Sequence, residues 1–243
     1  MKIATIVLPI FLFQFLAFCL PGNAINVQEN NKTFRILKKN AGLLDSISQL
    51  LVVFNDTPDS DSATLLAMEK KNKKWIIVSS PLPAGIGRNG FAAPDTKREG
   101  DKKTPTGFFR LGQLFCYEDG VNTRMPFIQA TSEDKWIDDP DSDDYNRHVR
   151  GSTQADSYEN LLLNGNDYRY CMVIEYNTNP VVKGNGSAIF LHLSEGESVN
   201  SSSGCVVLSQ KDMEQLLKWM DPELKPSILM GNEKVLRRGL RRK

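Results

Sequence analysis

Two residues of this chain, Cys205 and His192, have the types and the spacing of a nucleophile and its base. Cys205 lies between small, flexible residues and an apolar run, in a stretch that reads SSSGCVVLS from Ser201 to Ser209. His192, one of only two histidines, ends a strand-like run from which a loop can return to the cysteine. A neighbouring imidazolium lowers the pKa of a thiol and raises its thiolate fraction. The pair therefore predicts covalent catalysis, with a buried structural cysteine and a core histidine as the common alternatives.

The glycine before the cysteine adds to this hypothesis. Gly204 has no Cβ, so a substrate can approach the backbone closely at this point. Backbone N–H groups beside a nucleophile can stabilise the oxyanion of an acyl-transfer intermediate. We therefore predict an oxyanion hole formed by the N–H groups of Gly204 and Cys205.

No stretch of the sequence has the spacing of a metal site. The histidines and cysteines include no close-spaced pair of the kind that binds zinc. An acidic run lacks the spacing and the closing Glu of a calcium-binding EF-hand loop. Its carboxylates are Asp138, Asp139, Asp141, Asp143 and Asp144. We expect a solvated loop there.

The first 24 residues are typical of a secretory signal peptide. Lys2 is followed by a nearly unbroken apolar run, Ile3 to Leu20, and by the small residues that precede a predicted cleavage after Ala24. A retained signal-anchor is the alternative, because the run is almost long enough to span a bilayer. Cleavage predicts an exported protein with no stable membrane association.

Export makes the cysteines informative, because disulfides form in oxidising compartments. The predicted mature chain keeps Cys116, Cys171 and Cys205, which is an odd number. Cys116 and Cys171 lie in apolar, strand-like runs. We predict that these two pair as a disulfide or are buried, and that Cys205 is free.

The remaining pattern indicates a mainly β, single-domain fold with few helices and no βαβ rhythm. Strands are predicted at 49–55, 63–70, 75–80, 108–118, 170–177, 187–194 and 226–231, and residues 81–107 form a loop rich in Gly and Pro. A helix follows Cys205, with Ser209 as its N-cap and Pro222 beyond its end. A net charge of +1 does not indicate a nucleic-acid partner.

Several blocks occur in one order along the chain: GRNGF (87–91), GDKKTPTGFFRLG (100–112), WIDDPDSDDYN (136–146) and the run 186–222 around Cys205. Together they resemble the L,D-transpeptidase catalytic domain of the YkuD type, in its branch with a GCV-x-L signature. The resemblance implies a β-sandwich-like domain of mixed sheets. We place that domain at 46–232, between an N-terminal leader (25–45) and a basic, solvated tail (233–243).

The resemblance also implies roles for individual residues. Cys205 would be the nucleophile and His192 the base, supported by a backbone carbonyl of Leu193 or Ser194; Ser202 and Gly204 match the motif. The implied reaction is acyl transfer on peptidoglycan stem peptides through a cysteine thioester, which needs no metal or organic cofactor. The implied location is the periplasm or another part of the cell envelope.

Two departures from the family pattern leave the substrate open. Leu193 stands where many members have glycine, and Val207 stands where many have arginine. That arginine could anchor a substrate carboxylate or support the loop. The sequence therefore leaves three acceptors open: a stem peptide, a protein or water. An L,D-carboxypeptidase or other cysteine peptidase on wall peptides, and a non-catalytic wall-binding module, are the alternative functions.

Other residues have two interpretations each. Lys103, Thr104 and Thr106 either line a substrate groove or only shape their turn. Trp136 and Tyr145 either contact substrate or hold the acidic loop against the core. We expect His148 to be a surface residue.

Overall fold

The computed structural model describes residues 27–196 and 198–241. The predicted signal peptide lies outside these residues. Within them, no helix has the length and apolar character needed to cross a membrane.

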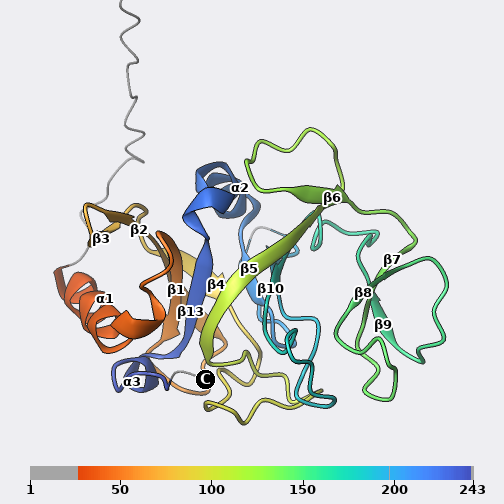
Figure 1. The fold of residues 1–243 in the computed structure, drawn as a ribbon, viewed down its shortest axis with the longest axis horizontal. Helices are drawn as coiled ribbons and strands as arrows, with labels where there is room; N and C mark the ends of the chain where they lie inside the picture. The colour runs from red at the N-terminus through yellow and green to blue at the C-terminus, as the bar shows by residue number, and fades with distance from the viewer. Residues whose placement is uncertain (1–26, 197, 242–243) are drawn as a thin grey trace, which may run out of the picture.

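One large mixed sheet dominates the described part of the chain (Figure 1). Its strand order is β1-β13-β5-β10-β11-β12-β4-β2-β3, with β6 beside β5, and β1 also pairs with β2, so that the sheet closes on itself. The strands are β1 Gln49–Asn55, β2 Ser62–Lys71, β3 Lys74–Ile77, β4 Leu82–Gly85, β5 Gly107–Cys116, β6 Phe127–Gln129, β10 Tyr170–Ile174, β11 Phe190–Leu193, β12 Val206–Leu208 and β13 Ser227–Asn232. The prediction of a mainly β fold with mixed sheets is confirmed.

Smaller elements lie around this sheet. A second sheet has the order β8-β7-β9, and at the right of Figure 1 it lies beyond β10. Its strands are β7 Asp134–Ile137, β8 His148–Arg150 and β9 Tyr158–Asn160. The α-helices are α1 Val27–Lys39, α2 Gln210–Trp219 and α3 Glu233–Leu236, and short 3₁₀ turns occupy Ala41–Leu43 and Pro222–Leu224.

Alternation along the strands separates three apolar clusters. In β1, Leu51 and Val53 face the core inside the closed sheet, whereas Leu50 and Val52 face α1 and α3. In β10 and β11, Cys171 and Phe190 face outward, toward the small sheet. Successive side chains of a strand point to opposite faces, so strands covered on both faces are apolar throughout, as the sequence pattern predicted.

The helix after Cys205 begins and packs as predicted. Ser209 is the N-cap of α2, and its hydroxyl accepts a hydrogen bond from the N–H of Asp212. Met213, Leu216 and Leu217 form its buried stripe. This packing helps to fix the segment that carries Cys205, because β12 leads directly into α2.

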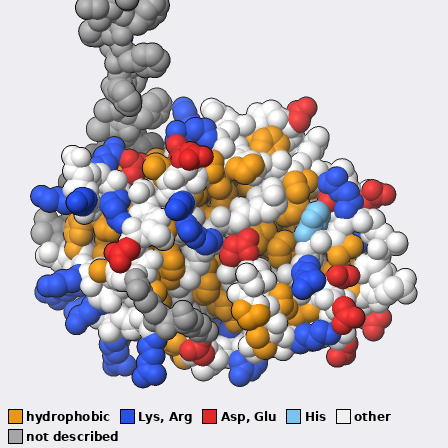
Figure 2. All heavy atoms as spheres, in the orientation of Figure 1, with side chains coloured by type: hydrophobic (Ala, Val, Ile, Leu, Met, Phe, Trp, Pro, Cys, Tyr) orange, Lys and Arg blue, Asp and Glu red, His pale blue; other side chains and the backbone are white. Residues whose placement is uncertain are grey.

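The leader and the tail contain helices that the sequence analysis did not predict. Ile36 and Leu37 of α1 are buried, as is Leu236 of α3. Asn40 joins the two helices, because its Nδ2 donates to the carbonyls of Ile36 (2.8 Å) and Leu236 (2.9 Å). Basic side chains gather over this end of the molecule in Figure 2, whereas acidic ones are densest over the small sheet at the right.

We expected the acidic segment to be a solvated loop, but the structure buries Asp134, just before it, and Asp139 within it. Asp134 at the start of β7 is fully buried and accepts hydrogen bonds from Arg150 Nε and His148 Nε2, each at 2.8 Å. Burial alone would raise the pKa of Asp134, but the hydrogen bonds from Arg150, Thr131 and His148 hold it well below its usual range. His148, with a quarter of its side chain exposed, is therefore part of a polar cluster around the buried Asp134 that joins β7 to β8.

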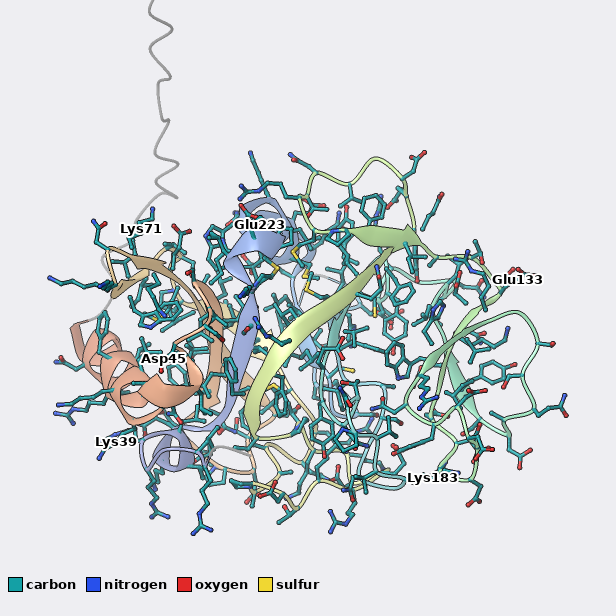
Figure 3. All side chains as sticks on the ribbon, viewed as in Figure 1. Lys39, Asp45, Lys71, Glu133, Lys183 and Glu223 are labelled. Atoms are coloured by element: carbon teal, nitrogen blue, oxygen red, sulfur yellow. The ribbon has the colours of Figure 1, made fainter. Side chains whose placement is uncertain are left out.

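The rest of that segment is tied to the neighbouring loop. Lys183, labelled in Figure 3, donates from Nζ to the carbonyl of Asp141 at 3.0 Å. Trp136 Nε1 donates to Asn146 Oδ1 at 2.9 Å, and its ring packs edge-on against Phe190. Tyr145 donates to Glu99 at 2.5 Å. Trp136 and Tyr145 therefore hold the segment against the core.

The predicted disulfide between Cys116 and Cys171 is wrong, and the alternative of burial is confirmed. Both thiols are free and buried. β5 and β10 are neighbours, but Cys116 lies opposite Tyr170 and Cys171 lies opposite Phe115. The two cysteines are thus one residue out of register and point to opposite faces, Cys116 into the inner core and Cys171 outward.

Thiol titration checks this arrangement. In protein denatured without reductant, we expect Cys116, Cys171 and Cys205 all to react with a thiol reagent, and prior reduction to change nothing at these three positions. Protection of Cys116 and Cys171 until reductant is added would contradict the observed register.

Replacing Asp134 checks the role of this cluster. We expect Asp134→Ala to lower the free energy of unfolding by about 2 kcal/mol, because Thr131, His148 and Arg150 lose the acceptor of their hydrogen bonds. Asp143→Ala, at a fully exposed carboxylate paired with Lys183, is the matched control and should cause no resolvable change in urea unfolding. Equal stability of the two variants would contradict the assignment.

Candidate active site

Two parallel strands bring His192 and Cys205 together. β11 and β12 pair in parallel, with Leu191 opposite Val206 and His192 opposite Val207. Leu191 and Val206 face the inner core, so His192, Cys205 and Val207 lie on the other face of the sheet. All three line one cavity of about 330 Å³.

The orientation of the His192 ring is set by its neighbours. Nδ1 lies 2.8 Å from the carbonyl oxygen of Leu193, and the Leu193 N–H in turn donates to the carbonyl of Asp167 at 2.9 Å. The ring of Tyr168 packs edge-on against the imidazole, with centroids 5.0 Å apart. A carbonyl can only accept, so Nδ1 carries the proton and Nε2 of the neutral ring is left as a base.

Cys205 is buried among backbone groups of the same strand region. Its Sγ donates to the carbonyl of Ala188 at 3.3 Å and accepts from the N–H of Phe190 at 3.4 Å. Burial raises the pKa of Cys205 to about 12 and lowers that of His192 to about 4. A neighbouring imidazolium would raise the thiolate fraction, but desolvation here favours a neutral thiol beside a neutral imidazole.

The turn before Cys205 is fixed by two hydroxyl groups. Ser202 Oγ donates to the carbonyl of Cys205 at 2.7 Å, and Thr104 Oγ1 donates to the same oxygen at 3.3 Å. Gly204 has a φ of +152°, and a Cβ there would lie 3.1 Å from the carbonyl oxygen of Lys103. A side chain at position 204 would therefore be strained, which is the physical reason for glycine.

One of the two N–H groups predicted to form the oxyanion hole already has a hydrogen-bond partner. The Gly204 N–H already donates to Ser202 Oγ at 3.0 Å, which withdraws it from a substrate. The Cys205 N–H has no hydrogen-bond partner within the residues that the structure describes. Of the two predicted donors, Cys205 N–H is the one left for an oxyanion.

The turn KTPTG (103–107) supports the site from outside the cavity. Thr104 is fully buried, and besides holding the Cys205 carbonyl it accepts from the Gly87 N–H at 2.8 Å. Thr106 donates to the carbonyl of Ala92 at 2.6 Å. Lys103, Thr104 and Thr106 are not among the described residues that line the cavity. Their contacts favour shaping the loop over lining a groove.

Most charged residues of the cavity were not predicted. Glu99, Asp138, Glu159, Asp167 and Glu195 line it, with Lys97 as the one Lys or Arg of the described lining. These residues are far apart in sequence, so spacing alone could not unite them. Within the described residues, no group of three His, Cys, Asp or Glu is arranged to hold a metal ion.

Histidine NMR tests the neutral pair. We expect ¹⁵N spectra to show His192 as the Nδ1–H tautomer at pH 6 and above, with a protonation midpoint near pH 4 because burial disfavours the cation. His192→Gln assigns the signal, and Cys205→Ala should leave the midpoint near pH 4. A midpoint at or above 6.5 that falls in Cys205→Ala would instead show a thiolate–imidazolium pair.

Comparison with known proteins agrees with this geometry. Residues 58–232 match the YkuD family, described as the L,D-transpeptidase catalytic domain. No curated protein matches the chain.

Two solved structures are similar over part of their length. One is Bd1075 of Bdellovibrio bacteriovorus, with 15% identity over 77% of this chain and 49% of that chain, and a TM-score of 0.42. The other is the helical cell shape determining protein Pgp2 of Campylobacter jejuni, with 16% identity over 82% and 54% of the two chains, and a TM-score of 0.39. This chain thus spans about half of each.

The family match covers well over half of the chain, including every strand from β2 to β13. The chain therefore belongs to the YkuD family of L,D-transpeptidase catalytic domains.

Proposed function

We propose that this protein is an exported L,D-transpeptidase, a cysteine acyltransferase that acts on peptidoglycan stem peptides through a thioester on Cys205. The observation that carries the proposal is the shared cavity of Cys205 and His192, with Nδ1 of the histidine held by the Leu193 carbonyl. Membership of the YkuD family supports the reaction class.

The first half of the reaction forms the thioester. Cys205 Sγ attacks the carbonyl carbon that precedes a terminal D-amino acid, and the thiol proton passes to His192 Nε2. The carbonyl π electrons move to its oxygen, which the Cys205 N–H can stabilise. When the tetrahedral intermediate collapses, the C–N bond breaks and the D-amino acid leaves with the proton from His192.

The second half regenerates the thiol. An acceptor amine loses a proton to His192 and attacks the thioester carbonyl, and the C–S bond breaks as the sulfur recovers a proton from the imidazole. An amide replaces the amide that was cleaved. Water in place of the amine would give a carboxylate and make the enzyme an L,D-carboxypeptidase.

A neutral Cys205 thiol beside a neutral His192 ring is compatible with these reaction steps. Burial makes an isolated thiolate or imidazolium costly, so charge would separate only when a substrate carbonyl is in place to accept the electrons. The Leu193 carbonyl then faces the imidazolium and stabilises its Nδ1–H. A side-chain carboxylate is not required for this role.

Export rests on the sequence of residues 1–24, which has the pattern of a secretory signal peptide. A peptidoglycan substrate lies outside the cytoplasm, so export and substrate agree. We place the working protein in the periplasm or elsewhere in the cell envelope.

Product analysis with a muropeptide that carries a tetrapeptide stem tests the function. We expect release of D-alanine together with a cross-linked dimer. Cys205→Ala and His192→Ala should each lower kcat/KM by about a thousand-fold or more, because one removes the nucleophile and the other the base. Cys116→Ala and His148→Gln, which lie outside the cavity, are the matched controls.

A carbapenem-type acylating probe gives a second measurement. Mass spectrometry should find one adduct, on Cys205 and not on Cys116 or Cys171. D-alanine release without a dimer would identify a carboxypeptidase. No adduct and no product would favour a wall-binding module, and activity that survives in both alanine variants would refute the mechanism.

A further inference from the structure

The cavity around Cys205 has an unfavourable charge balance for the reaction proposed above. Five carboxylate residues line it, against a single lysine among the described lining residues. Acyl transfer places negative charge first on Sγ and then on the carbonyl oxygen. Nearby carboxylates oppose that charge, and the charge of Glu159 adds to the burial that already raises the pKa of Cys205.

Few groups are available to offset this charge. The Gly204 N–H is engaged by Ser202, and Val207 stands where many family members have arginine. Among the described residues of the cavity wall, the only full positive charge belongs to Lys97.

Lys97 is held against the nucleophile turn. Its side chain is only 4% exposed. A Cβ built on Gly186 would lie 3.2 Å from Nζ, and one built on Gly204 would lie 3.8 Å from Cε. The lysine therefore packs beside the residue that precedes Cys205, and a side chain at either glycine would crowd it.

The ammonium keeps capacity for one further partner. Nζ donates to the carbonyl of Arg98 at 2.7 Å and to Asp101 Oδ1 at 2.6 Å. An ammonium has three N–H groups, so these bonds leave one in the described structure. Asp101 also accepts from the N–H groups of Arg98 and Lys103, which fixes the loop that carries Lys97.

We propose that Lys97 supplies the positive charge that stabilises the anionic sulfur of Cys205 and the oxyanion that forms on the substrate carbonyl when this sulfur attacks it. The proposal rests on the function proposed above, and it assigns to Lys97 an electrostatic task that the uncharged Val207 cannot perform. Lys97 lowers the pKa of Cys205, against the larger effect of burial. The competing interpretation is that Lys97 only closes its loop through Asp101.

Alkylation by iodoacetamide separates these interpretations and needs no peptidoglycan. The Cys205 thiolate displaces iodide from the reagent, so below the pKa of the thiol the rate follows the thiolate fraction. We expect Lys97→Met to slow alkylation of Cys205 about tenfold at pH 7 to 9, as for loss of one charge near a buried site. Peptide mapping by mass spectrometry distinguishes Cys205 from Cys116 and Cys171.

Three variants provide the controls. Lys97→Arg keeps the charge and should recover most of the rate, and Lys102→Met removes an exposed charge of the same loop and should not alter it. Asp101→Asn breaks the ion pair but keeps the ammonium, so the rate should not fall. If Lys97→Met does not fold, the double variant Lys97→Met, Asp101→Asn removes both charges of the pair, and it should be slower than Asp101→Asn alone.

Two outcomes would overturn the proposal. One is that Lys97→Met is alkylated at the wild-type rate. If its KM for a stem peptide is also raised, Lys97 binds a substrate carboxylate instead. The other is that the alkylation rate of Cys205 falls equally in Lys97→Met and Asp101→Asn. The effect would then come from the geometry of the loop and not from the charge of Lys97. Failure of the transpeptidase assay alone would leave the alkylation result intact, so the two proposals fail separately.

Discussion

The parallel pairing of β11 with β12 is the contact on which the candidate site depends. It aligns His192 with Val207 and, through alternation, places Cys205 and His192 on one face. The opposite face carries Leu191, Leu193, Val206 and Leu208, which are buried in the inner core. A slip of one residue would exchange these faces, so the apolar core fixes the register that the proposed chemistry needs.

The surroundings of this strand pair add rigidity by hydrogen bonding. Ser202 and Thr104 hold the Cys205 carbonyl, and the Thr104 loop is itself joined to Gly87. On the outer side, Trp136 and Tyr168 pack edge-on against Phe190, and Tyr168 also packs against His192. The small sheet, through Trp136, therefore packs against Phe190 of β11, the strand that also carries His192.

Burial decides the electrostatics of the site. It favours the neutral forms of Cys205 and His192, and the acidic lining of the cavity works in the same direction for the thiol. In the proposed mechanism, charge separates only when the substrate is bound. The separated charges are then stabilised by a few fixed groups, which are the Leu193 carbonyl, the Cys205 N–H and Lys97. In our proposal the positive charge near the nucleophile is held at Lys97, whereas position 207 carries an uncharged valine.

The sequence by itself determined the strands with continuous apolar runs, the capped helix after Cys205 and the identity of the Cys–His pair, because these depend on local periodicity and on rare residue types. It missed α1, α3 and the small sheet, whose few apolar residues are buried only by partners distant in the chain. It left open whether Cys116 and Cys171 are paired or only buried, and it did not indicate the partner of the Gly204 N–H or the effect of burial on Cys205. Strand register, hydrogen-bond partners and desolvation decide these three features, and only the tertiary structure determines them.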